Sequence, residues 1–310
     1  MSAAPAGVKN GHPPSAQEPH WSLAAVTQSS GIGAHTLRAW ERRYGFPKPA
    51  RLPSGHRRYT SEQVIRLRLI SQVLAAGHRA GAIVPLPLEK LRQMLEGGGT
   101  ETSKSLPAGQ LDALLEAAYR FDREAVISAF QGWWAELGLS SFLKERMAPL
   151  ARTIGAAWAE GRLDIRHEHF LTELMEDTLR SLRMPLDASA GGRPLLLATL
   201  PGERHALGLQ MVALAAAIAR RRVRLLGTQC PIPEILETAF KLDAAAVGLT
   251  VAGSSAFDET SFAIGELRAR LPASVQLWVG GGGANLLGEL PAGVLLFPDL
   301  DGLEPALASF

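Results

Sequence analysis

The spacing of apolar residues divides this chain into three parts with different periodicities. Two parts show only helical spacing, and the last alternates short uncharged apolar runs with helical stretches. The first run of the last part, Leu195–Ala198, is followed by Pro201-Gly202, and a helical pattern begins after Gly208. This order is typical of a buried parallel strand, a turn and a helix. The parts are residues 21–96, 107–187 and 192–310.

The last part predicts a doubly wound, flavodoxin-like parallel sheet. After the first strand, helical stretches alternate with four more apolar runs, and a helix closes the chain. Five strands alternating with helices favour this α/β architecture. The basic run Arg220–Arg222 suits the carboxyl end of the helix 206–221, where cations are favourable. The four further strands are expected at 223–227, 245–250, 275–280 and 293–297.

The middle part, residues 107–187, predicts a four-helix bundle. Asp122 and Ser140 are candidate helix caps, and Gly161 is a candidate helix stop. Short connections between consecutive helices favour antiparallel neighbours in a bundle. The pattern alone also allows a spacer or a dimerisation module. The helices are expected at 111–121, 123–137, 141–160 and 167–183.

The first part, residues 21–96, predicts a winged helix-turn-helix. A short apolar helix from Leu23 precedes a glycine-bearing turn and a second helix over 34–43. The turn Pro53–Gly55, between basic arms, suits a wing. An amphipathic helix over 61–78 and a shorter one follow, ending at a glycine run. We expect residues 1–20 to be a disordered leader and residues 97–106 to be a flexible linker.

Composition narrows the function only slightly. The formal net charge of the 310 residues is +2, so local charge must indicate the partners. Cys230 is the only cysteine, which excludes an intramolecular disulfide and a cysteine-rich zinc site. The sequence contains no apolar run long enough to cross a membrane and no signal-like leader. A cytoplasmic protein is therefore expected.

The winged part carries a strong local excess of positive charge. Residues 38–58 include seven basic residues and a single acid, Glu41. Such a local excess of positive charge is expected for contacts with DNA phosphates. A solvated surface is the alternative for this run, and Trp40 suits core packing equally well. The basic residues are Arg38, Arg42, Arg43, Lys48, Arg51, Arg57 and Arg58.

This region closely resembles the MerR-type winged helix-turn-helix over about 75 residues. The resemblance rests on the strings TLRAWERRYG from Thr36 and GHRRY from Gly55. It implies that the second helix enters the major groove of a double-stranded operator and that the wing holds the phosphate backbone. The implied DNA-binding residues are Arg38, Trp40, Arg42, Arg43, Tyr44, His56, Arg57, Arg58 and Tyr59.

The turn after the first strand of the sheet carries Glu203, His205 and Gly208. Loops at the carboxyl ends of such strands face the ligand crevice, and a carboxylate two residues away can orient an imidazole towards a metal. The spacing Glu-x-His-x-x-Gly resembles the motif of cobalamin-binding domains, which implies that His205 is the lower axial ligand of cobalt. By the same resemblance Thr250, Gly281 and Gly282 border the cofactor.

A second cluster lies at the ends of two expected bundle helices. Trp158 is followed ten residues later by Glu168 and His169. This spacing resembles the helical cap of CarH/LitR-type light-sensing regulators, which implies that these three residues cover the upper face of cobalamin. In that family a histidine follows the tryptophan and can take the upper cobalt position, but here Ala159 stands there.

Together the resemblances cover nearly all of residues 21–310. They imply a transcriptional regulator whose oligomeric state, as a homodimer or homotetramer, and DNA affinity respond to cobalamin, with adenosylcobalamin the expected form. One alternative is a MerR-type regulator that uses no ligand or another tetrapyrrole. A corrinoid methyl carrier or enzyme is another, although it leaves the basic winged part unexplained. Dinucleotide and nucleotide-triphosphate motifs are absent from the sequence, and we expect no catalytic residues.

Overall fold

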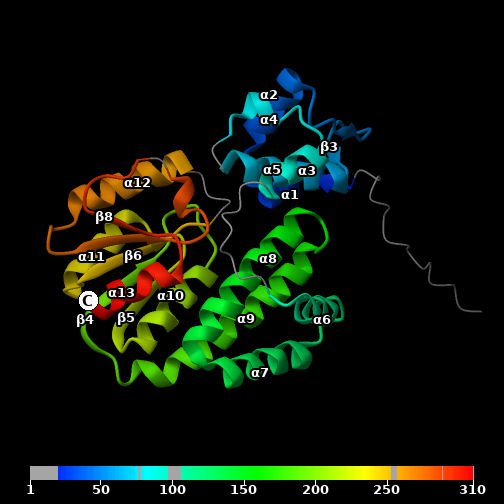
Figure 1. The fold of residues 1–310 in the computed structure, drawn as a ribbon. Helices are drawn as coiled ribbons and strands as arrows, with labels where there is room; N and C mark the ends of the chain where they lie inside the picture. The colour runs from blue at the N-terminus through cyan, green and yellow to red at the C-terminus, as the bar shows by residue number, and fades with distance from the viewer. Residues whose placement is uncertain (1–19, 76–77, 97–105, 253–256, 288, 310) are drawn as a thin grey trace, which may run out of the picture.

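The computed structural model describes residues 20–75, 78–96, 106–252, 257–287 and 289–309. Figure 1 shows three bodies in chain order: a small mixed domain, a group of long helices and an α/β domain. Their helices and strands lie within residues 21–96, 108–187 and 191–309. The expected leader over 1–20 and linker over 97–106 lie almost entirely outside the described residues.

The first domain is a winged helix-turn-helix. Its strands pair in the order β1-β3-β2, and the pairing of Ala50 with Arg58 is antiparallel, so the basic arms form the expected wing. The first helix begins where Ser22 accepts a hydrogen bond from the Ala25 N–H at 3.2 Å, and it ends at Gly31, whose φ is 70°. The elements are β1 Trp21–Ser22, α1 Leu23–Ser30, α2 Ala34–Tyr44, β2 Ala50–Arg51, β3 Arg57–Tyr59, α3 Ser61–Ala75, α4 Ala80–Ile83 and α5 Leu88–Glu96.

The middle body, which we call the helical cap, is the expected bundle. Asp122 caps α7 by accepting from the Ala125 N–H at 3.0 Å. The helices are α6 Ala108–Tyr119, α7 Arg123–Phe142, the π-helix η1 Leu143–Met147, α8 Ala148–Ala159 and α9 Ile165–Asp187. The break expected before residue 141 is only a kink at Gly138, whose φ is 73°. Ser140 is therefore no cap, and its hydroxyl donates to Glu304 at 2.8 Å instead.

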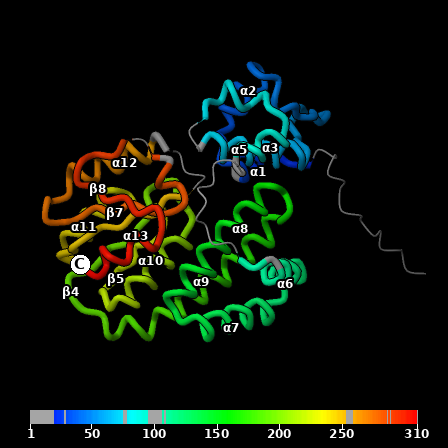
Figure 2. Tube along the Cα trace, viewed as in Figure 1, coloured from blue at the N-terminus to red at the C-terminus, as the bar shows by residue number. Residues whose placement is uncertain are grey.

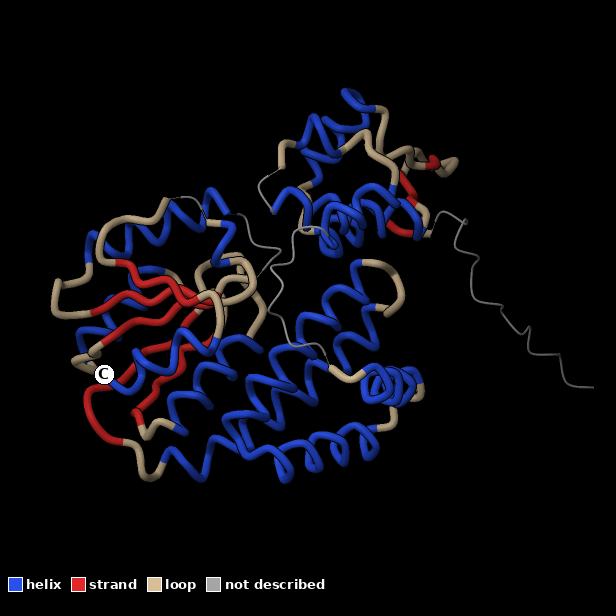
Figure 3. The backbone as a smooth tube through the Cα atoms, viewed as in Figure 1, coloured by secondary structure: helices blue, strands red, loops and turns tan. Residues whose placement is uncertain are grey.

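The α/β domain has five parallel strands in the order β5-β4-β6-β7-β8. This is the flavodoxin-like order, and its switch point lies between β4 and β6, where ligands bind at the carboxyl ends of the strands. Figure 3 shows the strands as one layer among helices. The elements are β4 Gly191–Ala198, α10 Leu207–Ile218, β5 Arg221–Gly227, α11 Ile232–Lys241, β6 Ala246–Thr250, α12 Phe257–Arg270, β7 Gln276–Gly280, η2 Ala284–Leu286, β8 Val294–Phe297 and α13 Leu300–Ser309.

Helix α10 joins the α/β domain to the helical cap. One of its faces, with Leu209 and Ala213, packs against the sheet, and another, with Met211 and Leu214, packs into the core of the cap. A helix that is apolar on all sides is stable only when it is buried on several sides. Figure 2 shows α10 between the sheet and α9. The turn before α10, which carries His205, is thereby held close to the cap.

The basic run Arg220–Arg222 has a different place from the one expected. Helix α10 ends at Ile218, and Arg221 begins β5. Its guanidinium donates to the carbonyl oxygens of Leu307 at 2.8 Å and Ala308 at 2.7 Å. The cation thus satisfies the free carbonyls at the carboxyl end of α13, not of its own neighbouring helix.

Candidate cofactor site and DNA surface

The turn after β4 is organised by the buried carboxylate of Glu203. One oxygen, Oε1, accepts from the backbone N–H of His205 at 2.9 Å and lies 2.5 Å from His205 Nδ1. The other, Oε2, accepts from the Ala252 N–H at 2.9 Å. Ala252 follows β6, so this single side chain connects the loops on both sides of the switch point.

The same turn is also fixed to the loop after β5. The Thr199 hydroxyl donates to the carbonyl of Glu203 at 2.7 Å and accepts from the Gln229 N–H at 2.9 Å. The Cys230 N–H donates to the Thr199 carbonyl at 2.9 Å. The backbone that carries His205 is thus held from two neighbouring loops before any ligand binds.

His205 presents one ring nitrogen to the space beyond the sheet. An ionised carboxylate only accepts, so Nδ1 donates to Glu203, and in the neutral imidazole Nε2 is then the unprotonated nitrogen. The side chain is 62% exposed, which leaves it accessible. The hydrogen bond to Glu203 raises the pKa of His205, burial opposes this, and the charges of Glu203, Glu168 and Glu176 add to the rise. The last two charges come from α9 of the helical cap.

Glycines allow close packing at the carboxyl ends of β6 and β7. A Cβ on Gly281, whose φ is 101°, would lie 2.5 Å from the carbonyl oxygen of Val251, so no side chain fits there. A Cβ on Gly208 would lie 3.3 Å from Thr250 Cβ. The Thr250 hydroxyl is buried without a hydrogen-bond partner among the described residues. Gly282 has free space around it, so it is compatible with the site but not required by packing.

Helix α9 carries the polar groups on the cap side. Glu168 accepts from the Thr172 hydroxyl at 3.0 Å and lies 2.6 Å from His169 Nδ1. His169 itself is 71% exposed. Both residues of the expected Glu-His pair therefore lie together at the start of α9, and Glu168 is close enough to His205 to affect its pKa.

Two residues of α9 near this site, Glu176 and Arg180, were not anticipated. Glu176 is buried on α9 and pairs with Arg180 one turn later, and burial raises the pKa of its carboxyl group. Glu168, Thr172, Glu176 and Arg180 recur every four residues, which places them in one stripe of the helix. This spacing could have indicated a polar face opposite His205.

The aromatic residues of the cap have different places. Trp158 lies at the end of α8, half-buried, and its indole N–H is buried without an acceptor in the described part of the chain. His167 is buried between Tyr119 and Phe121, with ring centroids 5.2 Å and 5.0 Å away. Burial lowers its pKa. His167 therefore belongs to the cap's own packing, and only His169 is exposed.

The chemistry of these groups suits a metal that is already bound within an organic macrocycle. No cluster of three or more His, Cys, Asp or Glu side chains within the described ranges could chelate an ion. His205 offers a single oriented nitrogen, which is enough when a macrocycle fills most other positions of the metal. The buried Thr250 hydroxyl adds a polar group without a hydrogen-bond partner among the described residues, and Gly282, just after β7, has free space around it. The residues therefore fit cobalamin.

The basic residues of the winged domain form an exposed surface. Arg38, Arg42 and Arg43 are exposed on α2. Arg57 lies on the wing and donates from Nε to Glu41 Oε2 at 2.9 Å, which joins the wing to α2. The single acid of this region thus orients the wing against the second helix and neutralises one of its arginines.

The remaining expected DNA-binding residues divide into core and surface. Trp40 and Tyr59 are buried, at 7% and 1% exposure, so they have the core role that was the alternative for Trp40. Tyr44 is half-buried, with the Arg43 guanidinium 5.3 Å from its ring. His56 is exposed at the wing tip near Ser54, and Arg58 is half-buried on β3. The surface available to DNA is therefore made of the arginines and His56.

Comparisons with known families match the three parts separately. Residues 22–86 match the MerR HTH family regulatory protein model. Residues 110–183 and 193–294 each match a B12 binding domain model. In addition, the described part of the chain contains no helix that is both long and apolar enough to cross a membrane.

Two curated relatives from Myxococcus xanthus align along most of the chain. The HTH-type transcriptional repressor CarH is 29% identical over 86% of this chain and 90% of its own length, and the HTH-type transcriptional repressor CarA is 25% identical over 85% and 87%. The Methanosarcina barkeri monomethylamine corrinoid protein shares the fold, with a TM-score of 0.51, 15% identity and coverage of 65% of this chain and 99% of that one. The chain thus matches a MerR HTH model followed by two B12 binding domain models, and it is similar along most of its length to two transcriptional repressors.

Proposed function

We propose that this chain is a transcriptional repressor whose DNA affinity and oligomeric state respond to cobalamin held between the helical cap and the α/β domain. The observation that supports it most directly is the pair formed by Glu203 and His205. The carboxylate is buried and fixes the imidazole through Nδ1, which leaves Nε2 available as a ligand. Such an orienting partner is common for histidines that bind metals.

The residues around the pair have separate roles in this proposal. His205 would bind the cobalt, and Gly281 and Gly282 would border the nucleotide tail beside the Thr250 hydroxyl. Trp158, Glu168 and His169 would cover the cofactor from the cap. When bound, adenosylcobalamin supplies a cobalt–carbon bond that green light can break. The protein's part is to orient the cofactor and to exclude water from its faces.

The DNA-binding half of the proposal rests on the exposed arginines of α2 and the wing. We infer that two or four copies of the chain bind repeated half-sites, because several linked helix-turn-helix units gain avidity that one unit lacks. A cofactor that fixes the cap against the sheet would alter the surface through which copies pair. The sign of regulation follows the two repressors to which the chain is similar. The chain acts in this view by binding and not by catalysis.

An absorption spectrum tests the cofactor site. The full chain is incubated in the dark with adenosylcobalamin, freed of unbound cofactor and compared with His205→Ala and with Arg204→Ala. Arg204 is exposed in the same turn, so it controls for a change in the loop. We expect the parent and Arg204→Ala to show a corrin spectrum with the signature of an axial histidine. In His205→Ala this signature should be lost. A parent protein that retains no corrin would contradict the proposal.

Exposure of the same samples to green light tests the response. A change in molecular mass and in operator affinity after illumination would make the chain a photoreceptor even though Ala159 cannot bind cobalt. Retained cofactor with no change in light would leave cobalamin itself as the signal. Specific DNA binding without any corrin would favour a regulator that uses no ligand or another tetrapyrrole, the alternative motivated by Ala159 and Thr250.

A further inference from the structure

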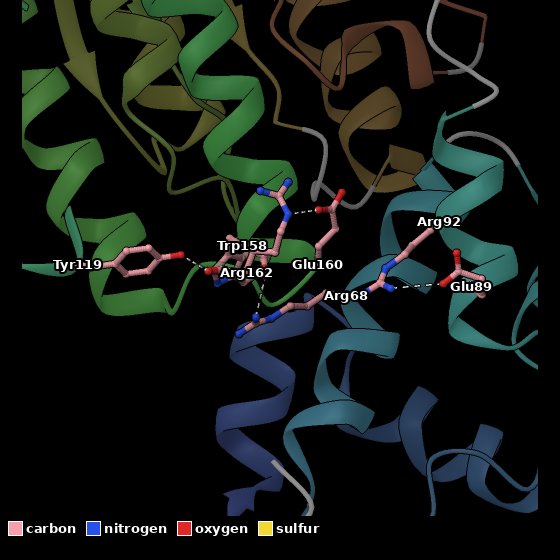
Figure 4. Close-up of polar contacts among 7 residues, drawn as sticks. All are labelled: Arg68, Glu89, Arg92, Tyr119, Trp158, Glu160 and Arg162. Atoms are coloured by element: carbon pink, nitrogen blue, oxygen red, sulfur yellow. Dashed lines mark hydrogen bonds and ion pairs between the residues drawn. The ribbon is translucent and has the colours of Figure 1, made fainter. Parts of the chain in front are cut away.

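The winged domain meets the helical cap at a small contact around Arg68 (Figure 4). Arg68 lies on α3 and donates from Nη1 to the carbonyl oxygen of Trp158 at 2.9 Å. Its guanidinium carbon is 4.1 Å from the centroid of the Trp158 ring. From Nε it donates to the Ser29 hydroxyl at 2.9 Å, which fixes it to α1 of its own domain. One side chain therefore connects the DNA-binding domain to the tryptophan of the cap.

The environment of Arg68 makes this contact strong for its size. The residue is only 5% exposed, and burial lowers its pKa to about 10, so it remains charged at neutral pH. A cation over an indole is bound most tightly when both groups are removed from water. The charges of Asp164 and Glu168 at the start of α9 favour the charged form of Arg68. Glu168 also raises the pKa of His205, so its charge acts on both sides of the cap.

The end of α8 is shaped to receive α3. Ala159 is fully buried and packs with the core of the winged domain, and the Trp158 ring packs against the cores of both bodies. A Cβ on Gly161 would lie 2.3 Å from Ile65 Cδ1, so a side chain at this position would require the Ile65 side chain to move. The position that holds a histidine in light-sensing relatives is here part of a contact between domains.

In the proposed function Trp158 has two partners, Arg68 and the cofactor, and these lie on different sides of the cap. In Figure 1 the winged domain lies at the end of α8, whereas the sheet lies along the other side of the cap. Arg68 holds the ring and the carbonyl of Trp158 from the winged domain. Under the proposed function the cofactor would contact the same residue from the side of the sheet.

We propose that Arg68 is a positioning residue that holds the Trp158 ring from the DNA-binding side, so that cobalamin binding and docking of the winged domain on the cap stabilise each other. This inference rests on the proposed function. Coupling between two binding events is reciprocal: docking raises the affinity for the cofactor by the same factor by which the cofactor favours docking. The state of the cofactor would then set the orientation of the winged domain without any contact between cofactor and DNA.

The first experiment measures adenosylcobalamin affinity in the dark for full-length Arg68→Gln and Arg92→Gln. Arg92 lies on α5 and pairs with Glu89 at 3.4 Å within its own domain, so its change removes an arginine without touching the cap. We expect Arg68→Gln to weaken binding about tenfold, within the usual range of coupling between sites, and Arg92→Gln to leave it unchanged. Equal affinities for the parent and Arg68→Gln would overturn the proposal.

A double-mutant cycle separates positioning from a general loss of structure. In a Trp158→Ala background, Arg68→Gln should change the cofactor affinity less than about twofold, because the ring through which it acts is gone. If the two losses multiply instead, Arg68 acts by another route and the proposal fails.

Cross-linking measures docking without reference to the cofactor. The Ile65 Cβ lies 3.9 Å from an ideal Cβ on Gly161, within the range of a disulfide, so Ile65→Cys with Gly161→Cys, in a chain also carrying Cys230→Ser, can report the docked state. We expect Arg68→Gln to slow disulfide formation and adenosylcobalamin to accelerate it when Arg68 is present. Unchanged cross-linking in Arg68→Gln would show that Arg68 does not dock the domain. Slower cross-linking with unchanged cofactor affinity would show docking without coupling and would also overturn the proposal.

The two measurements also distinguish failure of the proposed function. If the parent retains no cobalamin, the proposed function fails and the coupling fails with it, whatever Arg68 does. Cross-linking that still depends on Arg68 would then show only an arginine that joins two domains. A parent that binds cobalamin normally while Arg68→Gln is unaffected would leave the proposed function intact and remove only this inference.

Discussion

The helical cap contacts its two neighbours in very different ways. Towards the α/β domain it shares one apolar core with α10, to which Leu207, Met211 and Leu214 contribute. Towards the winged domain it presents, among the described residues, the end of α8 and Gly161 just after it, with the buried cation Arg68 over Trp158. A broad apolar core is disrupted only by unfolding, whereas a small contact centred on one charged group can open and close. The contact with the α/β domain therefore forms the cofactor site, and the contact with the winged domain can open or close in response to that site.

The largest effect is expected for a truncation in the α10 contact. Leu214→Ala removes a fully buried side chain from the core shared by α10 and the cap. Buried leucine truncations cost about 2–5 kcal/mol of unfolding free energy. Thermal or denaturant unfolding of the full chain should show this loss in both the cap and the α/β domain. Separate transitions for these two bodies would mean that they do not share one cooperative core.

A smaller effect is expected from overpacking the other contact. Ala159→His places a large side chain where Ala159 is fully buried against the winged domain. Overpacking costs about 1–3 kcal/mol, but here the domains can separate instead of unfolding. Limited proteolysis between residues 96 and 106 should become faster, with the melting of the cap and α/β domain unchanged. A lower melting temperature of those two bodies would show that the contact is also part of their core.

The cofactor site should respond without disturbing either contact. Glu203→Gln removes the carboxylate that orients His205, and loss of such a partner typically weakens metal binding about 10–100-fold. The pKa of His205 is raised by Glu203, so protons compete with cobalt as the pH falls through this raised value. In Glu203→Gln the pKa of the free His205 imidazole should fall, because the hydrogen bond that raises it is weakened. An NMR titration of this imidazole from pH 8 to 5 in the protein without cofactor measures the change. An equal pKa in the parent and in Glu203→Gln would show that Glu203 does not control the proton on His205.

The smallest effect is expected at the rim of the α10 contact. Lys144 pairs with Glu304 at 3.0 Å and with Asp301 at 3.1 Å, which joins the cap to α13. Exposed ion pairs contribute about 0–1 kcal/mol, so Glu304→Gln should shift the unfolding midpoint only slightly. The glutamine side chain is uncharged but similar in size to glutamate, so this substitution isolates the charge. A loss as large as that of Leu214→Ala would mean that charge and not apolar packing joins the two bodies.

Local patterns in the sequence were sufficient for the domain order and most elements. Helical spacing, glycine stops and uncharged apolar runs depend on neighbours within a few residues, and these predicted the winged domain, the bundle and the five-stranded sheet. Alternating strands and helices predicted a doubly wound, flavodoxin-like sheet, and the observed order β5-β4-β6-β7-β8 is the flavodoxin-like one. Short α4 was missed because a one-turn helix leaves little periodicity to detect, whereas the break expected between residues 137 and 141 corresponds to the kink at Gly138.

The tertiary structure alone decided the contacts between residues that are far apart in the chain. Arg68 and Trp158 are separated by 90 positions, and no spacing rule joins them. Arg221 was expected to face the end of α10, but it binds carbonyls of α13 that lie 86 and 87 positions away. The sequence determined that a Glu-x-His turn follows the first strand. Only the packing of α10 against α9 decided that Glu168 and Glu176 act on this histidine, because charges interact through space and the fold alone sets the distances.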